Sequence, residues 1–362
     1  MQSFKRILVL NNYSVARVKK EINYGNKPSH HLYGISQLEK LGYNLIIIDP
    51  TENIWRKIGK FLGRIPFLNL GDLDQQISAL RRVNEYDIIY APCQNVTNLL
   101  GILSYFKLLD KKIIAIAHHP TLVGRIATIR KISMYFTIKG HYKWGALSNT
   151  VANEINSIAH SKIAVSLAWG PDLSYYDHVL EQLEHGNNKD VDLISIGRTG
   201  RDYDVLVRAF NNTNISVEIY CSRESSLYLL DKCTKNIKII NLDNEEALTY
   251  PQVIKLCTRA KILAVPLNAT TSLAGLTSVA DAMALGMPLL ITYNKYIEFD
   301  IEGEGMGHWL QLGNDQEWLE KATYLLNDPE GLLRISKKTR KIAEERFNII
   351  NFTDQLIKLL EL

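Results

Sequence analysis

Residues 274–288 read AGLTSVADAMALGMP, in which two glycines flank a short run that is apolar at regular intervals. The apolar residues recur at the spacing of one helical face, giving the stripe Leu276, Val279, Ala280, Met283 and Ala284. Gly275 allows the tight turn that opens this helix, and Gly286 ends it before Pro288 begins the next strand. The stretch therefore predicts one helix and one strand of a doubly wound α/β sheet.

The first turn of this helix is also a candidate ligand site. Backbone N–H groups and the positive end of the helix dipole at Gly275, Leu276, Thr277 and Ser278 suit an anion such as a pyrophosphate. Asp281 follows one turn later, where its carboxylate is placed to accept a hydrogen bond from a ribose hydroxyl. These residues predict a nucleotide pocket. A plain strand–helix unit with a glycine-capped helix is the alternative interpretation.

Outward from this stretch, short apolar runs alternate with helical periods along the chain. Buried strands are predicted early in the sequence at residues 6–10, 44–49, 87–91, 113–117 and 163–168. Between the first two strands lies a predicted helix with the apolar stripe Leu32, Ile35, Leu38 and Leu41, and Gly42 follows as its C-cap. This alternation of strands and helices predicts a parallel sheet.

A second series of elements follows the polar stretch at residues 185–190. Its predicted strands are residues 192–197, 217–221, 237–241, 261–266 and 288–293, and its predicted helices are residues 202–210, 252–260 and 276–285. The chain therefore contains two units of similar size, each with its own doubly wound sheet, as its length of 362 residues also suggests.

Composition excludes several other classes of protein. A hydrophobic content of 46% and a charged content of 22% are typical of folded domains, and a net charge of +4 does not indicate a nucleic-acid binder. The cysteines form no Cys-x-x-Cys pair, so we expect neither a metal site nor a disulfide framework. The sequence has no run of about 18–20 apolar residues and no signal-peptide core, and we expect a cytoplasmic protein.

The 274–288 stretch resembles the signature of the family-4 retaining glycosyltransferases, a glycine-containing loop before a helix ending in Glu-Ala-Met-Ala-Leu-Gly-x-Pro. Asp281 stands where that family has its second glutamate, which holds the ribose and is one methylene longer. The family's first glutamate, which contacts sugar hydroxyls, falls on Leu273 in this sequence. Hydroxyls at residues 270–272 are a candidate replacement.

Three more segments carry the resemblance. Residues 195–203, SIGRTGRDY, resemble the segment that grips the donor diphosphate, with Arg198 at the family arginine and Arg201 as the second cation. Residues 169–176, WGPDLSYY, resemble the hinge element Asn-Gly-Val-Asp-x-x-x-Phe, and residues 146–154 resemble the strand and helix before it. Residues 327–347 resemble the tail after the donor domain.

The resemblance implies an α/β protein of the GT-B fold, with two Rossmann-like domains whose parallel sheets face a central cleft. The expected domains are residues 1–168 for the acceptor and 169–342 for the nucleotide-sugar donor, with residues 343–362 as a helix that packs back on the first domain. The family also has a histidine at the end of a strand in the first domain, facing the sugar.

The residues that match this acceptor side follow two predicted elements. His118 is the candidate catalytic residue, at the end of the strand 113–117, and His119 is the second candidate and an expected acceptor contact. Lys27, His30 and His31 lie in the loop where the family often has two glycines, and they are candidate acceptor contacts. Helix capping is the alternative role for these three residues.

The implied function is a retaining, metal-independent hexosyltransferase that uses a UDP- or GDP-linked sugar as substrate and needs no cofactor. Its expected acceptor is a glycan or a lipid-linked sugar of cell-envelope or exopolysaccharide synthesis. Asp72 and Asp74 have the Asp-x-Asp spacing of metal-using enzymes, but we interpret them as surface residues of a loop. A sugar-nucleotide epimerase remains an alternative, and so does a catalytically silent partner, because of Leu273.

Two basic segments bear on the acceptor. Residues 55–67 place Trp55, Ile58, Leu62 and Ile65 on one helical face and Lys57, Lys60 and Arg64 on another. No acidic residue occurs between Asp110 and Glu154, an interval with seven lysines and arginines. We expect contact with an anionic membrane at its inner face. A solvated basic face is the alternative.

Overall fold

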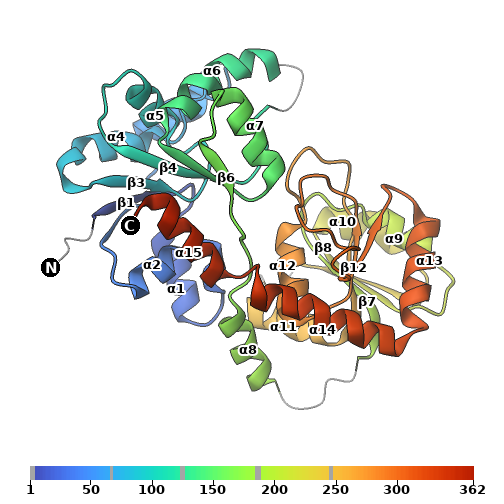
Figure 1. The fold of residues 1–362 in the computed structure, drawn as a ribbon. Coiled ribbons are helices and arrows are strands. Elements are labelled where there is room, and N and C mark those ends of the chain that lie inside the picture. The colour runs from blue at the N-terminus through green and yellow to red at the C-terminus, as the bar shows by residue number, and fades with distance from the viewer. Residues whose placement is uncertain (1–4, 66–67, 123–126, 184–188, 244–247) are drawn as a thin grey trace. The chain divides into compact units, whose positions relative to one another are not determined.

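The computed structural model describes residues 5–65, 68–122, 127–183, 189–243 and 248–362. In this part of the chain the strands form two six-stranded parallel sheets (Figure 1). Compactness divides the chain into a first unit of Met1–Tyr24, Ser29–Trp169 and Ile349–Leu362 and a second unit of Gly25–Pro28 and Gly170–Asn348. The sequence prediction divides the chain after residues 168 and 342.

The first unit has the strand order β2-β1-β3-β4-β5-β6. These strands are β1 (Ile7–Leu10), β2 (Leu45–Ile48), β3 (Ile88–Ala91), β4 (Lys112–Ala117), β5 (Lys143–Ala146) and β6 (Ala164–Ser166). The helices are α1 (Val15–Asn23), α2 (Ile35–Lys40), α3 (Ile54–Leu62), α4 (Leu73–Arg81), α5 (Asn98–Tyr105), α6 (Ala127–Gly140), α7 (Asn149–Ala159) and α15 (Ile349–Leu360). All the strands predicted from apolar runs in this part of the chain are present, and β5 is additional to these.

The predicted helix between the first two strands is wrong in part. Helix α1, capped by the Ser14 side chain, comes first, and α2 begins only at Ile35. Gly34 has φ of 85°, a left-handed conformation that interrupts the predicted helix. Leu41 is 56% exposed, whereas the other three residues of the predicted stripe are buried. Gly42, with φ of 85°, follows the helix end as predicted.

The second unit has the strand order β12-β11-β10-β7-β8-β9. These strands are β7 (Val191–Ile196), β8 (Val217–Cys221), β9 (Ile237–Asn241), β10 (Ala260–Val265), β11 (Leu289–Thr292) and β12 (Gly307–Leu310). The helices are α8 (Leu173–Gln182), α9 (Tyr203–Phe210), α10 (Arg223–Leu229), α11 (Tyr250–Thr258), α12 (Leu276–Leu285), α13 (Asp315–Leu326) and α14 (Pro329–Glu345). The predicted strands and helices of this unit are all present, and β12 is additional. Residues 185–188 of the predicted polar linker lie outside the described residues.

Strand order fixes where loops gather in each sheet. In the second unit the chain builds outward from β7 to β9 and then returns to place β10 on the other side of β7. The loops after β7 and β10 therefore meet at a topological switch point, which is where such sheets bind ligands. They are joined there by backbone hydrogen bonds from Asp202 N to Pro266 O (3.1 Å) and from Asn268 N to Gly200 O (3.1 Å). The corresponding switch point of the first unit lies between β1 and β3.

Helices α5 and α6 of the first unit meet through two glycines. A Cβ atom added to Gly140 would lie 1.7 Å from the carbonyl oxygen of Gly101, so this approach excludes any side chain. Next to it, His141 Nδ1 donates to the Thr137 carbonyl (2.7 Å), and its Nε2 forms a hydrogen bond with the Thr97 hydroxyl (2.8 Å). This contact holds the two helices together beside β4 and β5.

We predict that Gly140→Ala lowers the free energy of unfolding by about 1–3 kcal/mol, because the helices must separate to admit the methyl group. Thermal and urea unfolding measure the change. Gly63→Ala is the control, since its added Cβ meets nothing nearer than 3.3 Å and its φ is −63°. Equal stability of the two variants would contradict the glycine contact.

Candidate functional site

The predicted ligand site at α12 is built around a helix end that no side chain caps. Gly275 opens the helix with φ of 90°, which an L-residue rarely adopts. The loop before it is held by Asn294, whose Nδ2 donates to the carbonyls of Ser272 (3.1 Å) and Ala274 (3.0 Å). The N–H groups of Leu276, Thr277 and Ser278 begin the helix and thus belong to its positive end.

Arg201 lies beside this helix end. Its Nη2 donates to the Ser278 hydroxyl at 3.0 Å, and Arg201 forms an isolated bridge with Leu267 across the switch point. Burial lowers the pKa of Arg201. Its Nε is buried and has no partner among the described residues. A half-buried guanidinium with an unused N–H beside a helix N-terminus is suited to hold an anion.

Asp281 completes this group from the second turn of α12. Its Oδ1 accepts a hydrogen bond of 2.5 Å from the Tyr176 hydroxyl of α8. Burial raises the pKa of Asp281 to about 6, and the Tyr176 hydrogen bond and the Arg201 charge act in the opposite direction. Arg201, Ser278 and Asp281, predicted from the sequence as parts of one pocket, thus lie in one group.

Arg198 has different partners from Arg201. Its Nη2 donates to the Leu242 carbonyl at 3.1 Å, and its Nε lies 3.3 Å from Asp243 Oδ1. The side chain is 47% exposed, so these contacts are accessible to exchange for a ligand. Beside Arg201 the surface is hollowed by about 400 Å³, with Tyr203, Tyr228 and Asn268 among the lining residues.

In the first unit, His118 and His119 follow β4 as predicted. The Gln94 side chain holds both, since its Oε1 accepts from the N–H of His118 (2.6 Å) and of His119 (2.8 Å). Burial lowers the pKa of His118 to about 4, so the ring is neutral at pH 7. Its Nε2 lies 2.6 Å from the Pro92 carbonyl and must carry the proton in that bond. Nδ1 of His118 is then an acceptor.

The three candidates near residue 30 differ in their surroundings. His30 is fully buried, with its ring edge-on to Trp169 at 5.3 Å and 4.5 Å from the ring of His31. Its carbonyl accepts from Trp169 Nε1 at 3.2 Å. Lys27 belongs to the second unit, in the segment Gly25–Pro28. These contacts give His30 a packing role, and the acceptor roles of all three residues stay predictions.

Sequence reasoning missed three side chains that position the candidates: Tyr176, Gln94 and Asn294. Tyr176 lies in the hinge-like segment 169–176, where it stands at the position of the motif's phenylalanine. Gln94 and Asn294 follow β3 and β11, at the carboxyl edges where ligand-binding groups gather. Strand ends were therefore the available signal for the last two.

Comparison with known proteins adds to this geometry. No protein-family model matches the sequence, and no curated protein matches it either. HepE from Anabaena, solved in complex with UDP and glucose, is 14% identical over 99% of this chain and 100% of its own, with a TM-score of 0.63. A glycosyltransferase from Rickettsia africae is 14% identical over 100% of this chain and 98% of its own, with a TM-score of 0.69. The chain has the GT-B fold.

The predicted fold class of two Rossmann-like domains is thereby confirmed. A Listeria monocytogenes protein assigned as a UDP-N-acetylglucosamine 2-epimerase is also similar to this chain in structure. That protein is 9% identical over 98% of this chain and 95% of its own, with a TM-score of 0.60. Identities this low show the fold alone, so the reaction of this GT-B chain must be argued from its residues.

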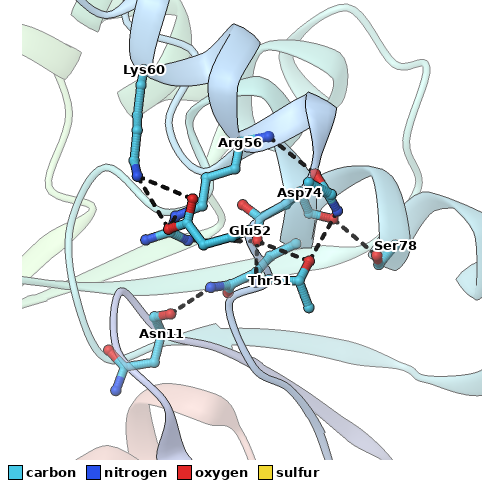
Figure 2. A network of polar contacts seen from close by, with 9 residues as sticks. Asn11, Thr51, Glu52, Arg56, Lys60, Asp74 and Ser78 are labelled. Carbon is cyan, nitrogen blue, oxygen red and sulfur yellow. Dashed lines mark hydrogen bonds and ion pairs between the residues drawn. The ribbon is translucent and has the colours of Figure 1, made fainter.

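The interpretation of Asp72 and Asp74 as surface residues of a loop is wrong for Asp74. Asp72 precedes α4, and Asp74 lies within that helix with only 1% exposure. Figure 2 shows Asp74 directed toward Thr51 and Arg56, with Oδ2 accepting from Thr51 N at 2.7 Å and lying 3.5 Å from Arg56 Nη1. Gln75 and Gln76 follow Asp74, so the local sequence is polar and does not indicate this burial. Asp74 is therefore a structural carboxylate of the GT-B chain.

The basic helix α3 ends at Leu62, and residues 66–67 of the predicted segment lie outside the described residues. Three of its large side chains are exposed, Ile54 by 63%, Trp55 by 38% and Phe61 by 64%, whereas Ile58 and Leu62 of the predicted apolar face are half-buried. Lys60 and Arg56 both pair with Glu52, as Figure 2 shows. Lys57 on the helix and Arg64 just beyond its end are exposed cations. Part of the predicted basic face is therefore neutralised locally.

The acid-free interval is also balanced in space. Glu361, from the end of the chain, accepts from Lys112 (2.6 Å), Lys143 (2.9 Å) and the Tyr142 hydroxyl (2.6 Å). These contacts lower the pKa of Glu361 to about 2. Lys107 and Lys139 line a hollow of about 740 Å³ nearby. Residues 123–126 of the interval lie outside the described residues, and none of the described helices could span a membrane.

We predict that Asp74→Ala lowers the free energy of unfolding by about 3–5 kcal/mol, because Arg56 then loses a buried partner. Asp72→Ala is the matched control. Its side chain makes no capping hydrogen bond, so the expected loss is about 1 kcal/mol or less. Urea unfolding measures both changes. Equal losses of stability in the two variants would contradict the structural role of Asp74. The same holds if manganese stabilises the wild type and stabilises neither variant.

Proposed function

We propose that this GT-B chain is a glycosyltransferase that takes a sugar from a nucleotide-sugar donor bound by the second unit. The observation that carries the proposal is the convergence of Arg201, Ser278 and Asp281 beside the uncapped start of α12, at a topological switch point. Such a group combines a cation and free N–H groups for a diphosphate with a carboxylate for a ribose.

In this proposal the helix end and Arg201 bind the diphosphate of the donor, and Arg198 exchanges its contact with Asp243 for a phosphate oxygen. These groups stabilise the negative charge that builds on the departing nucleoside diphosphate, so no metal ion is needed for it. The buried, unused Nε–H of Arg201 supports this role, because a charge-assisted hydrogen bond would satisfy it. Asp281 holds the ribose.

His118 has a positional role in the proposal. With Nε2 bonded to the Pro92 carbonyl and a neutral ring, its Nδ1 accepts a hydrogen bond from a sugar hydroxyl. Its low pKa makes it a weak base, so it orients the sugar and does not remove a proton at neutral pH. Membership of family 4, the retaining outcome and transfer of a hexose are included in the proposal, and the motif at residues 274–288 supports them.

The solved neighbours support a uridine nucleotide as the donor. HepE from Anabaena was solved with UDP and glucose and also with UDP-glucose. Leu273, buried to 5% exposure where the family has a glutamate, supports the alternative of a silent binding partner. The Listeria protein supports the alternative of an epimerase. Turnover assays distinguish these three functions.

We predict that the protein releases UDP or GDP from a nucleotide sugar, that added acceptor from membrane extract accelerates release, and that activity survives EDTA. Arg201→Ala and Arg198→Ala each weaken nucleotide binding by about 10- to 150-fold, the loss of one charge-assisted bond. Calorimetry with UDP and GDP measures binding, and a coupled assay measures release.

Asp72→Ala serves as a control that should bind nucleotide as the wild type does. Nucleotide release without any acceptor and with an altered sugar would favour the epimerase. Nucleotide binding without turnover of any sugar nucleotide would favour the silent partner. Activity that EDTA removes and manganese restores would exclude the metal-independent mechanism, and unchanged affinity in both arginine variants would exclude this pocket.

The acceptor in the proposal is a glycan or lipid-linked sugar at the inner face of an anionic membrane. Exposed Ile54, Trp55 and Phe61 on α3 supply apolar anchors, and Lys57 and Arg64 supply charge beside them. A helix with this composition suits the membrane interface, where apolar groups enter the headgroup layer and cations face it. The basic hollow with Lys107 and Lys139 supports an anionic partner as well.

We predict that the protein sediments with vesicles of phosphatidylglycerol at about 0.05 M salt, that binding falls at about 0.5 M salt, and that phosphatidylcholine vesicles retain little protein. Trp55→Ser with Phe61→Ser reduces binding. Leu333→Ser is the control, since Leu333 is an exposed apolar residue of α14 with 57% exposure. Protein that stays in the supernatant under all these conditions would favour a soluble acceptor.

A further inference from the structure

Two departures from the family pattern meet in the second unit. The hinge-like segment 169–176 ends in Tyr176 where the motif has phenylalanine, so it carries one additional hydroxyl. Helix α12 carries Asp281 where the motif has glutamate, so it lacks one methylene. These positions are 105 residues apart, yet the added hydroxyl donates to the shortened carboxylate at 2.5 Å.

The Tyr176 side chain is held firmly in this place. It is fully buried in the cluster that joins α8, α11 and α12, with Val179, Ile254 and Ala284 as its other buried members. Its ring lies edge-on to that of Tyr250 at 6.5 Å. The Asp172 side chain caps α8, which fixes the turn that presents Tyr176. The hydroxyl therefore meets Asp281 from a rigid element.

We propose that Tyr176 is a positioning residue for the ribose-binding carboxylate, and that its hydroxyl compensates for the short reach of Asp281. The inference rests on the proposed function, because it assigns Asp281 to a ribose. One carboxylate oxygen accepts from Tyr176, which orients the group and leaves the other oxygen for the ribose hydroxyls. Specificity for a ribonucleotide over its deoxy forms thus depends on a pair of side chains from two helices.

The electrostatic surroundings add a pH signature. Asp281 faces the Tyr176 hydroxyl from α8, Arg201 from the loop after β7 and the Cys257 thiol from α11, with Tyr250 of α11 behind Tyr176. Burial raises the pKa of Asp281 to about 6, and the Tyr176 hydrogen bond favours the ionised form. Ribose binding therefore weakens as pH falls through about 6, and loss of the hydroxyl moves this midpoint to higher pH.

Calorimetry from pH 5 to pH 8 tests the inference, with UDP or GDP, whichever the wild type binds more tightly, and with its 2′,3′-dideoxy analogue. The wild type should prefer the ribonucleotide by roughly tenfold or more at the high end. Tyr176→Phe should reduce this preference about threefold to tenfold and raise the midpoint pH. The double variant Tyr176→Phe, Asp281→Glu should regain much of the preference, because the longer side chain reaches the ribose without the hydroxyl.

Tyr220→Phe is the matched control, since Tyr220 is also buried and donates to a carboxylate, Glu218, at 2.8 Å. It should bind both nucleotides as the wild type does. Asp281→Asn distinguishes a failure of the Tyr176 inference from a failure of the proposed nucleotide site. If Asp281→Asn loses the ribose preference while Tyr176→Phe keeps it at every pH, the inference is wrong and the nucleotide site stands. If Asp281→Asn also changes nothing, the proposed nucleotide site itself is wrong.

A second variant covers the case in which Tyr176→Phe does not fold. Asp281→Glu alone keeps the charge and leaves Tyr176 in place, so its longer side chain meets the hydroxyl in the wrong position. It should bind the ribonucleotide at least threefold more weakly than the wild type. Unchanged ribose preference in this variant would overturn the coupling of the two residues.

Discussion

The parallel pairing of β7 with β10 is the constraint on which the candidate ligand site of the second unit depends. Ile262 and Leu263 pair with Leu193 and Ile194, although about 70 residues separate the two strands along the chain. This pairing brings Arg201 against Leu267 and sets α12 at the same edge. The end of α12 is fixed in turn by α14, because Arg340 Nη1 donates to the Ala284 carbonyl at 2.6 Å. Helices α8 and α12, together with the loop after β7 that is bridged to Leu267, therefore supply the group around Asp281.

Much of the second unit could be predicted from the sequence, because short-range patterns indicate its helices and strands. The apolar stripe of α12, the two glycines at its ends and the apolar runs of the strands are all short-range features. Each lies where the sequence predicted it. The pairing of Tyr176 with Asp281 was not predictable, since no periodicity connects side chains 105 residues apart. The break before Ile35 was also missed, because the apolar spacing continues through Gly34 while its positive φ interrupts the helix. The spacing of apolar residues thus predicts helices and strands, but it does not predict polar contacts between residues that are distant in sequence.

Charge is the property that the sequence describes least well. Residues 111–153 contain no carboxylate, yet Glu361 lies against Lys112 and Lys143. Likewise, Asp74 has the spacing of a metal ligand but serves Thr51 and Arg56 inside the fold. In both cases the partner is distant in sequence. The electrostatic character of a site in this protein must therefore be judged from its contacts, and this applies to Arg198 and Asp243 as well.

The return of α15 to the first unit has a consequence for how the protein is made. Phe352, Leu356 and Leu360 are fully buried in that unit. Leu356 packs closely against Gly34, since a Cβ added to Gly34 would lie 2.8 Å from Leu356 Cδ2. The first unit includes β1, which starts at Ile7, but it lacks part of its core until α15 has left the ribosome. The second unit is complete earlier, when Asn348 has been synthesised. On the ribosome, the unit that contains β1 is thus completed after the unit that contains β7.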